Sequence, residues 1–169
     1  MKEDNKILKL VYTFFLGLLL AIFVGVGINT FYPGPKAPEF PIELNTYGKA
    51  PELTSEQIKI QKNWDQKAAQ HNKDMRPYNR NVSILTLVSA VIFLVVSMIF
   101  EKRIKIIADG VMLGGLFTLL YSIGRGFASE NSKYVFAVVS VGLVIVLYLG
   151  YHRFVREHGI VSKIAKEKS

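Results

Sequence analysis

Four long apolar runs constrain the fold of this chain more than any other feature of its sequence. They cover residues 10–28, 81–100, 110–124 and 134–151, and none of them contains a charged residue. A helix rises roughly 1.5 Å per residue, so the first run would be about 28 Å long, close to the ~30 Å hydrocarbon core of a bilayer. The sequence therefore predicts an integral membrane protein built from helices.

The expected architecture is an all-α, four-helix transmembrane bundle. Its spanning helices comprise residues 10–30, 81–100, 106–126 and 134–152, and the segments outside them are 1–9, the insert 31–80, the charged hairpin 101–105, the loop 127–133 and the basic tail 153–169. A cleaved signal peptide is the alternative for the first run. Its apolar region, however, is longer than the roughly 7–15 residues typical of such peptides.

The insert 31–80 holds all six prolines and the only tryptophan of the chain. Its first part, 33–51, is proline-rich, and 33–41 favours extended, polyproline-like backbone. That segment is either a strap over the helices or a stiff spacer. Thr54 and Gln57 match a capping box, which predicts a helix start. We expect a helix over about 55–76 that breaks or kinks at Pro77.

One face of this expected helix is apolar. Its stripe consists of Ile60, Trp64, Ala68, His71 and Met75, which recur at helical spacing. The strap and the helix would together form a small extracytoplasmic cap. Trp64 is the candidate contact for a protein partner, and the alternative is that it packs inside the cap itself.

The third run is too short to span a bilayer alone, because its charge-free part would measure about 22 Å as a helix. The span must therefore extend to Asp109 and Arg125, which brings both charges near membrane depth. Arg125 can extend its head outward along its stem, whereas Asp109 needs a partner. Lys105, four residues earlier on the same helix face, is the expected partner. The alternative role for Asp109 is an ion or proton relay.

Small residues recur at every fourth position in two of the runs. They are Gly17, Ala21 and Gly25 in the first run, and Gly110, Gly114, Thr118, Ser122 and Gly126 in the third. Small side chains let helices approach closely in lipid. The two ridges are expected to cross each other within one chain, or each could meet its copy in an oligomer.

The distribution of basic residues predicts the orientation. Eleven Lys and Arg residues lie in the N-terminus, the hairpin and the tail, against six near the membrane on the other side. Because positive charge favours the cytoplasmic side, we expect both termini in the cytoplasm and the insert outside, in the plasma membrane. The formal net charge of +8 then reflects orientation in the bilayer, and no nucleic-acid surface is expected.

No enzyme signature accompanies this topology. The chain has no HExxH, GxSxG or phosphate-binding loop, its three histidines are scattered and it has no cysteine. We therefore expect no cofactor, no metal site and no catalytic activity.

In outline the layout is similar to four-helix junction and large-pore channel proteins. Those families join their outer loops through cysteines, which this chain lacks, so the resemblance extends to topology alone. We expect a non-catalytic scaffold or accessory subunit that acts through its insert, with the bilayer and a protein partner or a second copy as its contacts. The alternative is a homo-oligomeric channel or transport subunit.

Overall fold

The computed structural model describes residues 2–44 and 54–155, which are helical apart from the extended segment 32–41 and the turns. The elements are α1 (Lys2–Phe31), the 3-10 turn η1 (Ile42–Leu44), α2 (Ser55–Phe100), α3 (Lys105–Phe127), α4 (Ser132–Gly150) and the π-turn η2 (Tyr151–Val155). Within these residues, four helices are long and apolar enough to cross a membrane, which indicates an integral membrane protein. Part of the predicted proline-rich segment, 45–51, and of the predicted tail, 156–169, lies outside the described residues.

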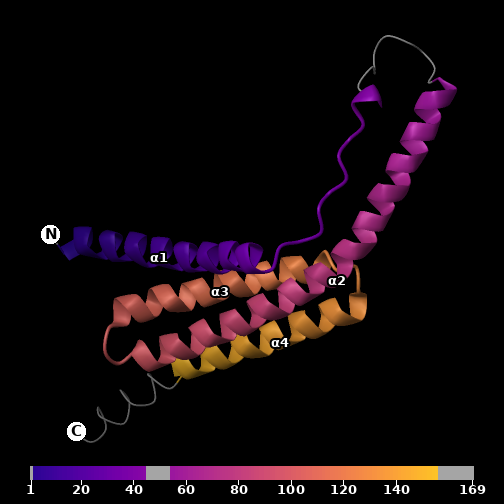
Figure 1. Cartoon of the computed structure of the whole chain (residues 1–169). Coiled ribbons are helices and arrows are strands. Elements are labelled where there is room, and N and C mark those ends of the chain that lie inside the picture. Colours follow the sequence, from indigo (N-terminus) through magenta and orange to yellow (C-terminus); the bar gives the residue numbers. More distant parts are fainter. Residues whose placement is uncertain (1, 45–53, 156–169) are drawn as a thin grey trace, which may run out of the picture.

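The sequence predicted that a helix over 55–76 breaks or kinks at Pro77, and the structure shows no break there. The capping box starts the helix as expected, with the Gln57 amide donating to Thr54 Oγ1 at 3.3 Å, but the helix then runs through Pro77 to Phe100. It changes direction where it reaches the other helices (Figure 1). The residue whose carbonyl Pro77 leaves unbonded, Lys73, is exposed, so water can satisfy that carbonyl.

Helices α2 and α3 form an antiparallel hairpin through the short turn at 101–104 and pack along their length. The interface consists of small and hydroxyl-bearing side chains, with Val82, Ser83, Thr86, Thr118 and Ser122 essentially inaccessible to solvent. A Cβ on Gly115 would lie 2.6 Å from Leu94 Cδ2. The two backbones are therefore as close as glycine at this position allows.

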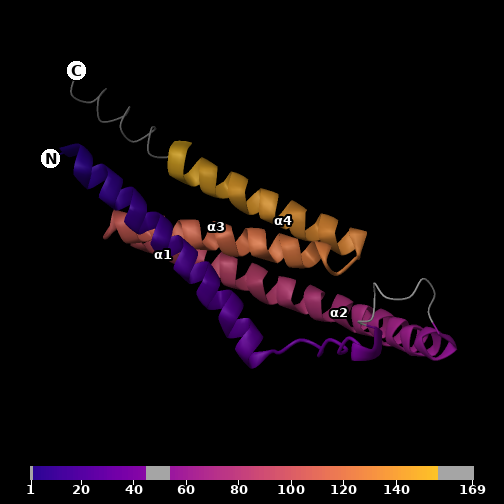
Figure 2. The same ribbon diagram turned by 90° about the horizontal axis from the view of Figure 1, so that it is seen from above.

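Helix α1 crosses α3 obliquely and has few contacts with α2 (Figure 2). The crossing lies at Gly17, where a Cβ would stand 3.0 Å from the backbone nitrogen of Gly114. Gly110 is packed against Leu16, and Gly114 against Leu20. In the described structure, Gly17 of the first ridge therefore meets Gly114 of the other ridge within one chain.

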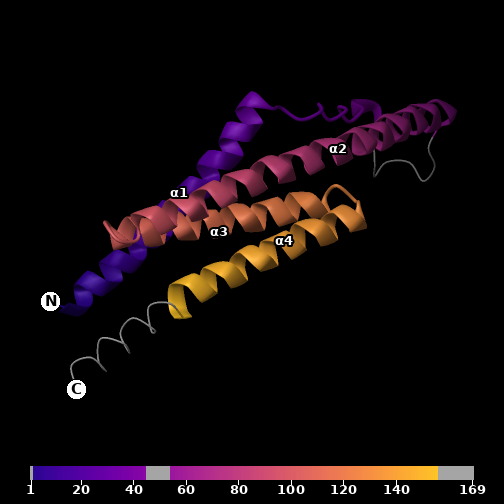
Figure 3. The ribbon, with the colours of Figure 1, turned by 90° about the horizontal axis from the view of Figure 1, so that it is seen from below.

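Helix α4 packs against α3 on another side (Figure 3), with Gly142 against Leu119 and Ile123. Both α1 and α4 expose many large apolar side chains, which suits helices that face lipid. The start of α1, the 101–104 turn and the end of α4 lie at one end of the bundle in all three views. The start of α2 extends beyond the opposite end.

Candidate functional site

The part of α2 that extends beyond the bundle is accompanied by the strap, residues 32–44 (Figure 1). We call the strap together with residues 54–77, which are the N-cap Thr54 and the first part of α2, the arm. All five residues of the predicted apolar stripe, Ile60, Trp64, Ala68, His71 and Met75, are partly buried. On the strap, Gly34, Pro38, Pro41 and Leu44 are the less exposed positions, a spacing of three to four that fits a polyproline-like chain lying along a helix.

Aromatic contacts hold the strap to the helix at both ends. Phe40 meets Trp64 edge to face at 5.3 Å between ring centroids, and near the membrane Tyr32 stacks on Tyr78 at 5.4 Å. At the far end of the arm, Gln57 Nε2 donates to the Glu43 carbonyl at 3.4 Å. Trp64 therefore packs against the strap inside the arm, which was the alternative to a contact with a protein partner. Its Nε1 has no hydrogen-bond partner in the described residues.

The arm is also fixed at its foot, where α2 enters the bundle. The Tyr78 hydroxyl donates to the Tyr32 carbonyl at 3.1 Å, and Asn81 Nδ2 donates to the Tyr32 hydroxyl at 3.0 Å. Buried Asn79 donates to the Ala128 carbonyl in the turn between α3 and α4. These bonds join the strap, α2 and the α3–α4 turn, and so connect the arm to the bundle.

Arg125, predicted near membrane depth, lies at this foot. Its guanidinium sits 5.2 Å from the centre of the Tyr78 ring and 5.9 Å from that of Tyr121, both within the range of cation–π attraction. The aromatic faces thus stabilise a charge that the short third span brings toward the bilayer.

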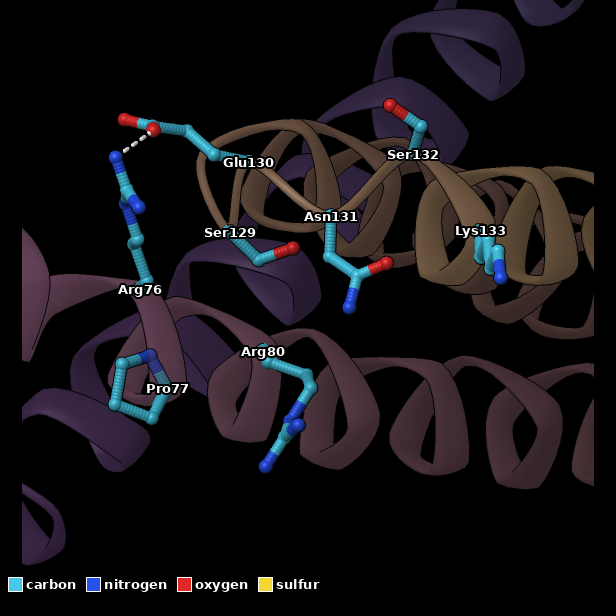
Figure 4. A pocket seen from close by; sticks show the side chains of 8 residues that line it. All are labelled: Arg76, Pro77, Arg80, Ser129, Glu130, Asn131, Ser132 and Lys133. Carbon is cyan, nitrogen blue, oxygen red and sulfur yellow. Dashed lines mark ion pairs between the residues drawn. The ribbon is translucent and has the colours of Figure 1, made fainter.

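An open groove of about 470 Å³ lies beside the foot, between α2 and the α3–α4 turn (Figure 4). It is lined by Arg76, Pro77, Arg80, Ser129, Glu130, Asn131, Ser132 and Lys133. Arg76 forms an ion pair with Glu130, whose backbone has a positive φ of 54°. Asn131 Oδ1 caps α4 by accepting from the Tyr134 amide at 3.1 Å.

The groove offers positive charge but no catalytic constellation. Arg80 and Lys133 remain outside the Arg76–Glu130 pair, and the neighbouring Ser129 hydroxyl donates to the Gly126 carbonyl rather than to a base. Among the described residues, no group of three histidine or carboxylate side chains is placed to hold a metal ion.

Asp109 lies at the opposite end of α3 from Arg125, so the structure does not bring these two predicted site residues together. Its ion-pair partner is Arg153, from the π-turn after α4, and not Lys105 as the sequence spacing suggested. Arg153 also contacts Glu101, with Nε 3.6 Å from the carboxylate, and donates to the Met112 sulfur. This cluster ties together the ends of α2, α3 and α4.

The predicted small residues divide between two neighbours of α3. Gly110 and Gly114 face α1, whereas Ser122 and Gly126 contact Ser83 of α2, and Thr118 bonds to the Gly114 carbonyl of its own helix. Gly25 has nothing within 4 Å of an added Cβ, and no contact is described for Ala21. The sequence also carries a signal for the interface between α2 and α3: Ser83, Thr86, Ala90 and Ser97 recur at intervals of one or two helical turns on the face of α2 that meets α3.

Comparison with known protein families, curated proteins and solved structures finds no match to this chain. Its function must therefore be inferred from its own residues and their arrangement.

Proposed function

We propose that this chain is a non-catalytic membrane scaffold or accessory subunit that presents its arm to a protein partner outside the cytoplasm. The observation that carries the proposal is the unbroken course of α2 from the arm into the bundle. A continuous helix whose apolar stripe is covered by the strap is a stiff projection, and stiffness lowers the entropic cost of holding a binding surface away from the bilayer.

The tip of the arm supplies the contact surface. Ile42 and Ile58 are 80% and 53% exposed, and each lies next to one of the residues, Glu43 and Gln57, that join the strap to α2. Apolar side chains exposed on a part of the protein outside the lipid are candidates for burial against another protein. They replace Trp64 as the residues to test, because Trp64 is already packed against Phe40.

The orientation is part of the same proposal. The start of α1, the 101–104 turn and the end of α4 lie at one end of the bundle, and the arm lies at the other. Basic residues concentrate at the first of these ends, so we place it in the cytoplasm and the arm outside the plasma membrane.

The test measures the size of the complex in the protein's own membranes. A tagged chain, extracted in mild detergent, should migrate on a native gel with a partner, and Ile42→Ser with Ile58→Ser should return it to the mass of the chain alone. Lys59→Ser with Lys62→Ser, on the exposed polar face of the same arm, is the matched control and should leave the complex intact. A wild-type chain that always migrates alone would refute the proposal.

A homo-oligomeric channel or transport subunit is the second candidate, favoured by one observation. The second half of α1 is open, since an added Cβ on Gly25 or Gly27 would meet nothing within 4 Å, so another copy could pack there. A path for ions would then run between copies, because the α2–α3 interface is closely packed. Ion flux in reconstituted vesicles that changes with Asp109→Asn would support this candidate, and a lack of flux would count against it.

A further inference from the structure

A second groove lies between α1 and the start of α3, at the end of the bundle opposite the arm. Its volume is about 590 Å³, and its walls include Lys6, Lys9 and Leu10 from α1 and Ile104, Lys105 and Ile106 from the hairpin side. The two helices touch at Gly17 and Gly114 and separate from that crossing toward the start of α1 (Figure 2). The groove is therefore a wedge between two helices, closed at its deep end by the crossing.

Among the described residues, no carboxylate compensates the positive charge in this groove. Lys6, Lys9 and Lys105 are exposed, and no ion pair joins any of them to a carboxylate in the described part of the chain. The one acid in the lining, Asp109, is already paired with Arg153. The groove thus presents three ammonium groups that no carboxylate of the described residues neutralises.

The surroundings of these ammonium groups indicate what kind of anion fits. The lysines flank the ends of the apolar runs, which is the level of lipid headgroups, and the side chains between them are apolar: Leu10, Ile104 and Ile106. Below them, α1 exposes large apolar side chains along which acyl chains can lie. A ligand with a negative headgroup and apolar tails matches both parts of the groove.

We propose that the groove between α1 and α3 binds an anionic phospholipid, with the headgroup phosphate held by Lys6, Lys9 and Lys105. Basic pockets between membrane helices are suited to acidic headgroups. A bound lipid would fill the wedge where α1 leaves α3, and so hold α1 in its crossing position.

The test uses native mass spectrometry of the full-length chain in mild detergent. Phosphatidylglycerol should be retained at least about fivefold better than phosphatidylcholine with the same acyl chains, since one lysine near a charged lipid is worth roughly that factor. Lys6→Gln with Lys9→Gln and Lys105→Gln should abolish the preference, and Lys105→Gln alone should lower it. The control variant, Lys59→Gln with Lys62→Gln and Lys67→Gln, removes the same number of positive charges from the arm and should keep the preference for phosphatidylglycerol.

Three results would overturn the proposal. The first is equal retention of the two lipids by the wild-type chain. The second is a loss of the preference for phosphatidylglycerol in the arm control as large as in the groove variant. The third is displacement of phosphatidylglycerol by millimolar inorganic phosphate, which would indicate a site for free anions. The single Lys105→Gln variant keeps the test decisive if the triple variant does not fold.

Discussion

Two serines connect α2 and α3 by reciprocal hydrogen bonds. Ser83 Oγ donates to the Ser122 carbonyl and Ser122 Oγ donates to the Ser83 carbonyl, each at 2.7 Å and fully buried. Bonds between membrane helices contribute on average about 0.6 kcal/mol each, because the unfolded chain in lipid also finds partners. We expect Ser83→Ala to lower the free energy of unfolding by about 0.6 kcal/mol in an SDS titration from mixed micelles, because it removes one such bond.

The matched control is Ser89→Ala. Within the described part of the chain, Ser89 Oγ bonds to the Leu85 carbonyl of its own helix and not to another helix, so its removal should change the unfolding free energy little. Equal losses from the two variants would show that the bond between helices adds no more stability than a bond within one helix.

Arg153 is the residue whose loss should disturb the other end of the bundle. Its side chain is 15% exposed and compensates Asp109, which is 32% exposed, and Glu101. Arg153→Gln would remove the cation that both acids contact, and we expect a loss on the order of 2 kcal/mol, between the values for exposed and buried pairs. The same SDS titration measures it, and adding Asp109→Asn should restore part of the loss.

Lys105→Gln distinguishes the partner in the structure from the one that sequence spacing suggested. It should leave stability in detergent unchanged, because Asp109 pairs with Arg153. The sequence predicted that Asp109 needs a partner, but it could not identify one 44 residues away. That partner depends on the π-turn that follows α4, which hydropathy does not reveal.

At the scale of elements, the position of α1 depends on a few glycines. Leu20 Cβ lies 3.0 Å from the place of a Cβ on Gly114, and a disulfide needs these atoms roughly 3.5–4.5 Å apart, so Leu20→Cys with Gly114→Cys should form a disulfide within one chain after the helices separate by about 0.5 Å. Adding Gly17→Leu should prevent the cross-link, because its Cβ would meet the backbone nitrogen at position 114, which cannot move aside. Because the chain has no cysteine of its own, non-reducing gels report the cross-link directly.

Gly25→Leu is the control for this prediction, since nothing lies within 4 Å of a Cβ there. It should leave the cross-link yield unchanged. A disulfide-linked dimer in place of a cross-linked monomer would mean that the ridges meet between copies.

The four spans were predictable because the length of an apolar run is a local signal. The start of α2 was predictable for the same reason, from the capping box at Thr54. Whether α2 breaks or only kinks at Pro77 could not be decided from the sequence. A proline costs about 3 kcal/mol in a helix interior, so either outcome was expected there. The contacts on the far side of the proline, Tyr78 to Tyr32 and Asn79 to Ala128, offset that cost and become visible only when the chain is folded.

At the scale of the whole molecule, α3 is the helix that holds the others together. It packs along α2, is crossed by α1 and carries α4 on another side. α1 and α4 consequently have much of their surface facing lipid. The arm adds a stiff extension to one end of this assembly, so its function depends on which side of the membrane that end faces.

Labelling of single cysteines in intact cells tests that orientation. The reference chain has no cysteine, so Lys62→Cys on the arm and Lys102→Cys in the hairpin each introduce one reactive thiol at an exposed position. We expect a membrane-impermeant maleimide to label Lys62→Cys in intact cells, and Lys102→Cys only after permeabilisation, because the basic end of the bundle should stay in the cytoplasm. The reverse pattern would place the arm in the cytoplasm. The partner of the tip residues would then have to be sought there, and the lysine groove would face the outer leaflet.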